Sequence, residues 1–330
     1  MTTGHDIEPA LDIRDLHKEF ASAVAVDGVT MTIPRGEVFG LVGPDGAGKS
    51  TLIRLLTTVM VPTSGDALVF GNSVRTQSDA IKPRIGYMSQ AFSLYGDLTV
   101  RENLNFFAEL RGVSRADAAK RATKLLEFST LTEFAGRQAQ FLSGGMKQKL
   151  ALAVTLISEP DLLFLDEPTT GVDPVSRREF WRIISDLNRQ GITVFVATPY
   201  MDEAERCTEI AFMNHGRIIL RDTPEGVKSR VRGDVLEIGV ADYRAAMLVL
   251  RALPFVRSVD AAGEILRVLV DATDRKSEFE DRIRAALTDA GFPVTMMRDG
   301  VADLEMAFAT LIPTGESAGS SAEELAAVTG

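Results

Sequence analysis

The chain has 330 residues, of which 45% are hydrophobic and 25% are charged, as is ordinary for a folded globular protein. Its length suggests two domains, and its formal net charge of −10 argues against nucleic acid as a partner, because no overall field attracts phosphate backbones. The single cysteine, Cys207, excludes an intramolecular disulfide and is typical of a reducing compartment. The N-terminus does not have the pattern of a signal peptide, and no apolar run approaches the roughly 18 residues of a membrane span. We therefore expect any role at a membrane to require a partner.

Three short apolar runs predict strands buried in the parallel sheet of a layered α/β domain. They are residues 37–43 (EVFGLVG), 161–168 (DLLFLDEP) and 193–198 (TVFVAT), and each ends in polar or glycine-rich residues. In such sheets, ligands bind at the carboxyl ends of the strands. The functional side chains are therefore expected just after these three runs.

The segment GPDGAGKST follows the first apolar run and precedes a helical pattern, which favours a phosphate-binding loop over a simple glycine-rich turn. Backbone N–H groups of such a loop converge on phosphate oxygens, and the following helix adds partial positive charge at its N-terminus. Lys49 is expected to reach the β- and γ-phosphates, and Ser50 to bind the Mg²⁺ that bridges them. The predicted nucleotide-binding residues here are Gly43, Pro44, Asp45, Gly46, Ala47, Gly48, Lys49, Ser50 and Thr51.

Two adjacent carboxylates end the second apolar run. Asp166, at the strand end, suits a metal ligand that holds Mg²⁺ directly or through water. Glu167, just beyond it, is placed to polarise an attacking water. Asp-Glu-Pro after a strand is also a common turn, and the catalytic interpretation gains weight because the phosphate loop ends a comparable strand.

The segment FLSGGMKQKLALAVTLI, residues 141–157, places a serine and two glycines at the start of a helical pattern. One interpretation is a capped helix after a tight turn. The other is a second anion site, built from Ser143 and the amides of Gly144 and Gly145 at a helix N-terminus. A monomer needs one γ-phosphate site, whereas two copies facing head to tail would each cover the nucleotide of the other.

The domain organisation is predicted from changes of pattern along the chain. Residues 1–232 are expected to form the nucleotide-binding domain, and helical patterns between residues 100 and 134 predict an inserted helical subdomain at about 91–160. Residues 233–312 predict a small α+β accessory domain, for which a βαββαβ arrangement is our hypothesis. Residues 313–330 are rich in Gly, Ser, Ala and Glu, and we expect them to be disordered.

In their order, the motifs resemble those of the ATP-binding cassette (ABC) ATPases, the nucleotide-binding subunits of ABC transporters. The resemblance covers about residues 10–230, through GPDGAGKST, Gln90 in YMSQ, LSGGMKQ, LLFLDEP and Asp173 in TTGVDP. It implies a P-loop NTPase fold that binds ATP and Mg²⁺ and hydrolyses ATP. It further implies that Phe20 stacks on adenine and that Gln90 senses Mg²⁺ and the attacking water. Glu167 would then be the catalytic carboxylate, Ser143 with its glycines would close the partner's site, and Asp173 would contact the partner across a dimer.

Residue 199 departs from this resemblance. The family places a histidine that contacts the γ-phosphate just after the strand that follows Asp173, and this chain has Pro199 there. Proline neither donates a hydrogen bond nor carries charge, so we expect slower hydrolysis at the chain's own site and unimpaired ATP binding. The neighbouring Tyr200 offers a hydroxyl. A structural interpretation is also open, in which Thr198 caps a helix whose first position is Pro199.

The resemblance implies two kinds of partner. One is a second cassette, either a copy of this chain or a different chain that carries the histidine. The other is a pair of integral membrane subunits, which would hold the chain at the cytoplasmic face of the membrane and dock on Phe92, Leu94 and Tyr95.

The type of cassette is suggested by two further segments. FSLYGDLTVRENL and the C-terminal DLEMAFATL are most like ABC-2 type exporters of drugs, antibiotics or lipids, with importer cassettes as the nearer rival. An alternative from another class is a soluble ABC ATPase of translation or repair, against which stand the single cassette and the lack of a sustained heptad pattern. A further alternative is a regulatory subunit that binds ATP but scarcely hydrolyses it, and Pro199 keeps this alternative open.

Overall fold

The computed structural model describes residues 8–91, 94–271 and 276–311. The chain divides into two compact units, Met1–Thr223 and Pro224–Gly330. This division falls a few residues before the expected boundary at residue 232, because α8 (Pro224–Ser229) packs against α11 (Leu304–Leu311) of the second unit. The tail that we expect to be disordered, residues 313–330, lies outside the described residues.

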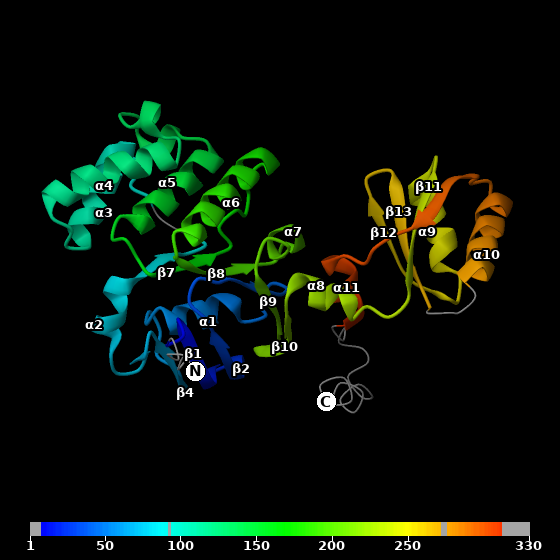
Figure 1. Cartoon of the computed structure of the whole chain (residues 1–330), viewed down its shortest axis with the longest axis horizontal. Coiled ribbons are helices and arrows are strands. Elements are labelled where there is room, and N and C mark those ends of the chain that lie inside the picture. Colours follow the sequence, from blue (N-terminus) through cyan, green and yellow to red (C-terminus); the bar gives the residue numbers. More distant parts are fainter. Residues whose placement is uncertain (1–7, 92–93, 272–275, 312–330) are drawn as a thin grey trace, which may run out of the picture. The chain divides into compact units, whose positions relative to one another are not determined.

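The first unit is built around a six-stranded sheet in the order β10-β9-β3-β8-β7-β6 (Figure 1). Its strands are β3 (Val38–Val42), β6 (Ile85–Met88), β7 (Leu162–Asp166), β8 (Thr193–Thr198), β9 (Glu209–Asn214) and β10 (Arg217–Asp222). All pair in parallel except β10, which runs antiparallel to β9. The three predicted apolar strands are β3, β7 and β8, and all of their residues are buried. Their carboxyl ends therefore meet at one edge, as expected.

A second, antiparallel sheet forms another layer of the first unit, and its strands lie in the order β2-β1-β4-β5. It contains β1 (Leu11–Phe20), β2 (Ala23–Ile33), β4 (Ser64–Val69) and β5 (Asn72–Ser73). One hydrophobic cluster joins this sheet, the central sheet and α1 (Lys49–Leu56), and it includes Ile13, Phe39 and Leu52. A short α2 (Ser78–Ile81) follows β5. The core thus packs directly beneath the phosphate loop that leads into α1.

The helical subdomain has a hydrophobic core of its own. It is formed by α3 (Val100–Leu110), α4 (Arg115–Phe128) and α5 (Gly144–Leu156), with Leu104, Leu126 and Leu150 among its fully or almost fully buried residues. The two helical patterns predicted from the sequence are confirmed as α3 and α4. Next along the chain, α6 (Pro174–Arg189) packs against α5, and Figure 1 shows these helices gathered on one side of β7 and β8.

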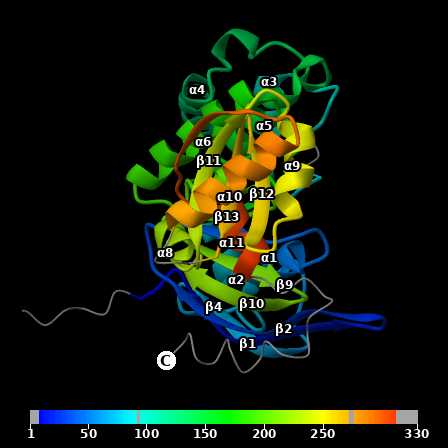
Figure 2. The ribbon, with the colours of Figure 1, turned by 90° about the vertical axis from the view of Figure 1, so that its right-hand side faces the viewer.

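The second unit has the hypothesised βαββαβ order. Its elements are β11 (Asp234–Val240), α9 (Tyr243–Arg251), β12 (Val256–Ala262), β13 (Ile265–Val270), α10 (Lys276–Asp289) and β14 (Val294–Asp299). The strands pair antiparallel in the order β12-β13-β11-β14. Alternate strand residues such as Ile238 and Val268 share a hydrophobic cluster with Leu250 of α9 and Ile283 of α10, and Figure 2 shows α10 in front of the strands. On the other face, Met306 of α11 packs on Val235.

Candidate nucleotide-binding site

The phosphate loop connects the end of β3 to the first residue of α1. Gly46 and Gly48 have φ values of 78° and 106°, in the left-handed region that favours glycine. A Cβ at Gly48 would also lie 2.1 Å from the carbonyl oxygen of Ala25 in β2. Only glycine therefore fits at position 48, where the loop passes the β1–β2 hairpin. The Lys49 ammonium folds back onto the loop and donates to the carbonyl oxygens of Gly43 at 2.8 Å and Pro44 at 3.0 Å. The loop therefore holds the lysine over the position predicted for phosphate.

The charge of Lys49 is set by opposing effects. The residue is 4% exposed, and burial lowers the pKa of its ammonium group. The carboxylates of Glu167, Asp45 and Asp166 raise this pKa in turn. A phosphate group bound in the loop would add negative charge and favour the ammonium form further.

Asp166 and Ser50 form a pair at the end of β7. The Ser50 hydroxyl donates to Oδ1 of Asp166 at 2.8 Å, and Asp166 is 1% exposed. Its second oxygen, Oδ2, is buried without a hydrogen-bond partner in the described part of the chain. Burial raises the pKa of Asp166, and the neighbouring Glu167 adds to this effect, while the Ser50 hydrogen bond lowers the pKa. An unpaired buried carboxylate oxygen beside a hydroxyl fits a cation.

These residues suit Mg²⁺ in particular. Mg²⁺ prefers oxygen ligands, and in phosphate-binding sites it uses one or two carboxylates together with the phosphates of the substrate. Asp166 and Ser50 supply oxygens of this kind. Over residues 8–91, 94–271 and 276–311, no group of three or more His, Cys, Asp or Glu side chains is arranged to hold a metal.

Glu167 and Gln90 meet at the same edge of the sheet. Nε2 of Gln90, which follows β6, donates to Oε2 of Glu167 at 2.9 Å, and the Thr170 hydroxyl donates to the same oxygen at 3.3 Å. Glu167 has a φ of 50°, and its backbone N–H donates to the carbonyl oxygen of Ala197 at 2.8 Å. This left-handed conformation is rare for a non-glycine residue and turns the chain sharply after β7. The structure thus brings together the two residues predicted to handle the attacking water.

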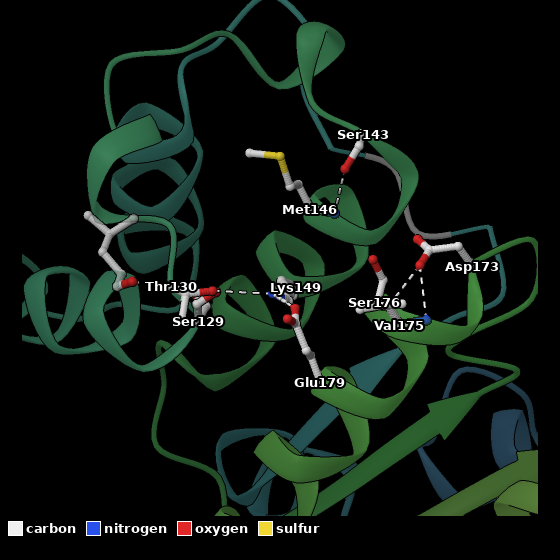
Figure 3. Close-up of polar contacts among 10 residues, drawn as sticks. Ser129, Thr130, Ser143, Met146, Lys149, Asp173, Val175, Ser176 and Glu179 are labelled. Atoms are coloured by element: carbon white, nitrogen blue, oxygen red, sulfur yellow. Dashed lines mark hydrogen bonds and ion pairs between the residues drawn. The ribbon is translucent and has the colours of Figure 1, made fainter.

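The LSGG segment and the aspartate of TTGVDP form a second group, at the N-terminal ends of α5 and α6 (Figure 3). Ser143 caps α5 by accepting a 3.3 Å hydrogen bond from the N–H of Met146. Asp173 caps α6 by accepting from the N–H groups of Val175 at 3.0 Å and Ser176 at 2.9 Å. Hydrogen bonding, chiefly from Ser176, holds the pKa of Asp173 below its ordinary value. The cap of the capped-helix interpretation is therefore confirmed, and the second anion site at Ser143, Gly144 and Gly145 stays a prediction.

The two groups of site residues are separate within one chain. In the ranges that the structure describes, no hydrogen bond or ion pair joins Ser143, Gly144, Gly145 or Asp173 to the phosphate loop, Asp166 or Glu167. Ser143, Gly144 and Asp173 are exposed, whereas Gly145 is buried against α6.

Phe20 lies at the end of β1, in the hairpin that passes the phosphate loop. It is 43% exposed, and the Lys18 ammonium lies 5.3 Å from the centre of its ring. Ala25 in the other strand of this hairpin is the residue that approaches Gly48. An exposed aromatic ring presents a face on which a flat base can stack.

The structure corrects the predicted place of Pro199. The helix after β8 is α7 (Met201–Ala204), so Pro199 precedes the helix and does not occupy its first position. The reason is that the Thr198 hydroxyl accepts a 3.0 Å hydrogen bond from the N–H of Tyr200, which keeps the chain in a turn. The guanidinium of Arg177 lies 4.4 Å from the centre of the Tyr200 ring.

A buried carboxylate in α7 was not found by sequence reasoning. Glu203 is fully buried, accepts a hydrogen bond from the Thr169 hydroxyl, and lies 4.0 Å from Nε of Arg177. These contacts tie the segment after β7 to the segment after β8. Glu203 lies in an acidic segment at the start of a helix, and such a segment predicts exposed side chains. The one sequence signal for its burial was the nearby small apolar residues Ala204 and Cys207, which are buried as well.

Comparison with known proteins identifies the class. Residues 26–170 match the family described as "ABC transporter". The chain is 40% identical over 237 residues to the "Daunorubicin/doxorubicin resistance ATP-binding protein DrrA" of Streptomyces peucetius, with 72% of each chain covered. The chain therefore belongs to the ATP-binding proteins of the ABC transporter family, and the predicted family is confirmed.

Two further relatives extend the comparison. The chain is 43% identical over 227 residues to the "Probable multidrug ABC transporter ATP-binding protein YbhF" of Escherichia coli (strain K12), covering 69% of this chain but 39% of that protein's length. Among solved structures, a dimeric post-hydrolysis state of the ATP-binding cassette MJ0796 bound to ADP and Pi matches with a TM-score of 0.60 and 25% identity, covering 64% of this chain and 98% of that one. The predicted α/β cassette fold is thus confirmed.

Proposed function

We propose that this chain binds ATP with Mg²⁺ and hydrolyses it to drive an ABC-2 type exporter of drugs, antibiotics or lipids. The observation that carries the proposal is the unpaired, buried Oδ2 of Asp166 beside the Ser50 hydroxyl, next to the Glu167–Gln90 pair and the phosphate loop. The export of drugs is supported by the names of the relatives, which refer to multidrug transport and daunorubicin resistance.

In this proposal each residue has one task. Lys49 and the loop amides bind the phosphates, and Ser50 and Asp166 would hold Mg²⁺, which would supply positive charge that offsets the phosphate charge. Glu167 accepts a proton from the attacking water, while its contact with Gln90 at 2.9 Å holds that carboxylate in place.

The active form is a pair of cassettes. Ser143 and Asp173 are exposed on the monomer and form no described hydrogen bond with the phosphate loop. A second cassette would therefore bring its own Ser143 and Asp173 to the nucleotide bound by this chain. The dimeric relative bound to ADP and Pi supports such pairing. Because Pro199 lacks a donor, the chain's own site turns over slowly and a different cassette with the histidine is a suitable partner.

Membrane subunits would dock beside the segment after Gln90, at the cytoplasmic face of the membrane. Tyr95 is 50% exposed and packs edge-on against Phe106 at 4.6 Å between ring centres, while Leu110 is 68% exposed. Contiguous exposed apolar side chains of this kind mark protein interaction surfaces. Leu94 is half-buried, and Phe92 lies outside the described residues. In the described part of the chain, no helix is both long and apolar enough to span a bilayer.

The test is ATP turnover by the purified chain, alone and together with its membrane subunits, beside the Glu167→Gln variant. The expected result is Mg²⁺-dependent turnover that falls in Glu167→Gln, with export of a drug from vesicles that contain the full complex. Co-purification with ribosomes or DNA in place of membrane subunits would support the alternative of a soluble ABC ATPase. Tight ATP binding with no turnover in any complex would instead support a regulatory role.

A further inference from the structure

A buried lysine joins the two helices whose N-terminal ends carry Ser143 and Asp173 (Figure 3). Lys149 in α5 is 8% exposed, and its Nζ lies 2.5 Å from Oε2 of Glu179 in α6. The same Nζ donates a 3.2 Å hydrogen bond to Oγ1 of Thr130, in the turn that follows α4. One ammonium group therefore connects α5, α6 and the end of α4.

The contacts along α5 and α6 indicate what this ion pair fixes. At the first turn, Gly145 approaches α6 so closely that an added Cβ would lie 2.4 Å from Oγ of Ser176. The Lys149–Glu179 contact lies about one helical turn further along both helices, which therefore run in the same direction. The Gly145–Ser176 contact sets how closely the two helices approach, and the ion pair one turn further adds a directional contact between them.

We propose that the Lys149–Glu179 pair is a positioning contact that fixes the LSGG end of α5 against the Asp173 end of α6. The two helix ends then meet a second cassette as one rigid surface. This inference rests on the proposed function, because it takes Ser143 to act on the nucleotide held by the partner. It follows that association of two cassettes depends on the pair, whereas ATP binding by the chain's own phosphate loop does not.

The test measures ATP-driven dimer formation by light scattering on the full chain in the Glu167→Gln background, which retains ATP. The affinity of the monomer for ATP and the unfolding temperature are measured on the same samples. Lys149→Ala is expected to weaken dimer formation about tenfold, within the range by which residues away from a binding surface change its coupling, with the monomer's ATP affinity changed by less than about twofold.

Two further variants keep the test decisive if the buried site does not tolerate alanine. Glu179 has a side chain that is 54% exposed, so Glu179→Ala removes the same ion pair from the surface side and is expected to weaken dimer formation in the same way. The charge-exchanged chain, Lys149→Glu with Glu179→Lys, is expected to recover most of the dimer. The matched control is Lys120→Ala, an exposed lysine of α4 that has no ion pair in the described residues, and it should behave as the parent.

The outcomes separate the inference from the function on which it rests. Dimer formation by Lys149→Ala and Glu179→Ala equal to that of the parent would overturn the inference. A joint fall of dimer formation, monomer ATP affinity and unfolding temperature would also overturn it, because the pair would then support the fold in general. A Glu167→Gln parent that binds ATP but never dimerises would overturn the paired function itself, and the inference with it.

Discussion

The phosphate-loop edge and the LSGG end of this cassette differ in the burial and the hydrogen bonding of their polar side chains. At the phosphate-loop edge, Lys49 and Asp166 are 4% and 1% exposed, and one oxygen of Asp166 has no partner in the described residues. Burial lowers the pKa of Lys49 and raises that of Asp166, so it favours the neutral form of both groups. At the LSGG end, Ser143 and Asp173 are exposed and already bonded to their own helices. The first region thus keeps an unpaired group in a buried place, while the second is an exposed surface whose polar groups are already bonded within their own helices.

Loss of the Glu167 carboxylate would test the catalytic part of this comparison most strongly. Glu167→Gln is expected to lower ATP turnover by a factor of about 10² to 10⁴, because a positioned general base contributes that much. ATP binding should persist, because Lys49 and the loop amides that bind the phosphates in our proposal are unchanged. Steady-state phosphate release and equilibrium ATP binding check both parts, and turnover equal to wild type would exclude Glu167 as the base.

Loss of the Lys49 ammonium should remove binding itself. Lys49→Ala is expected to weaken ATP affinity at least about 100-fold, because charge-assisted hydrogen bonds to two phosphates are lost. Calorimetric titration with a nonhydrolysable ATP analogue measures the loss. Lys120→Ala, on the surface of α4, is the matched control and should bind as wild type does. A Lys49→Ala chain with near-normal affinity would mean that the loop amides alone hold the phosphates.

Restoring a histidine at position 199 tests the proposed defect at this edge. Pro199→His is expected to raise turnover about tenfold, because it adds a donor that is worth about 1.5–3 kcal/mol when charge-assisted. Tyr200→His places the same side chain one residue later and should bring no gain. An unchanged rate in a folded Pro199→His chain would falsify the account based on the missing histidine.

The raised pKa of Asp166 predicts how the metal site depends on pH. Mg²⁺ needs the ionised carboxylate, so its affinity should fall by up to about tenfold per pH unit once the pH drops through this raised pKa, earlier than for an ordinary aspartate. Without metal the sign is opposite, since the folded cassette favours the protonated group and its contribution to stability grows as the pH falls. Mg²⁺ titrations of the ATP-bound chain at several pH values, with Asp166→Asn as the flat control, measure the effect.

The smallest expected effect is at the LSGG end. Ser143→Ala should cost about 1 kcal/mol of folding free energy, because it removes the cap of α5, whereas Ser143→Asn should retain most of it. Thermal unfolding of the three chains compares them. Equal stability of all three would show that the Ser143–Met146 hydrogen bond does not stabilise the monomer.

The strands and the glycine-rich loop of the candidate nucleotide site were predictable because their patterns are local. Continuous apolar runs predicted β3, β7 and β8, and the structure places the glycine-rich loop between β3 and α1 as expected. The meeting of Gln90 with Glu167 followed from the family resemblance alone, because the strand before Gln90, β6, was not among the predicted strands.

Features that depend on distant contacts were missed. β12 (VRSVDAA) has few apolar residues, and its pairing with β13 defines it as a strand. The burial of Glu203 depends on Thr169, and the burial of Lys149 depends on Glu179 and on a turn after α4. Pro199 was placed wrongly because the Thr198 side chain bonds to the turn and delays the helix. For β12, Glu203 and Lys149 a contact between separated segments decided the outcome, whereas for Pro199 a local hydrogen bond between residues two apart did so.

The close approach of Gly145 to Ser176 has a consequence for building hybrid cassettes. A chimera that takes its LSGG helix from one relative and its α6 from another would combine two halves of a contact that has no room for a methyl group. Any larger residue on the α5 side would force the helices apart and change the surface offered to the partner. Residues 143–189 should therefore be exchanged as one block, because this segment holds both helices of the contact.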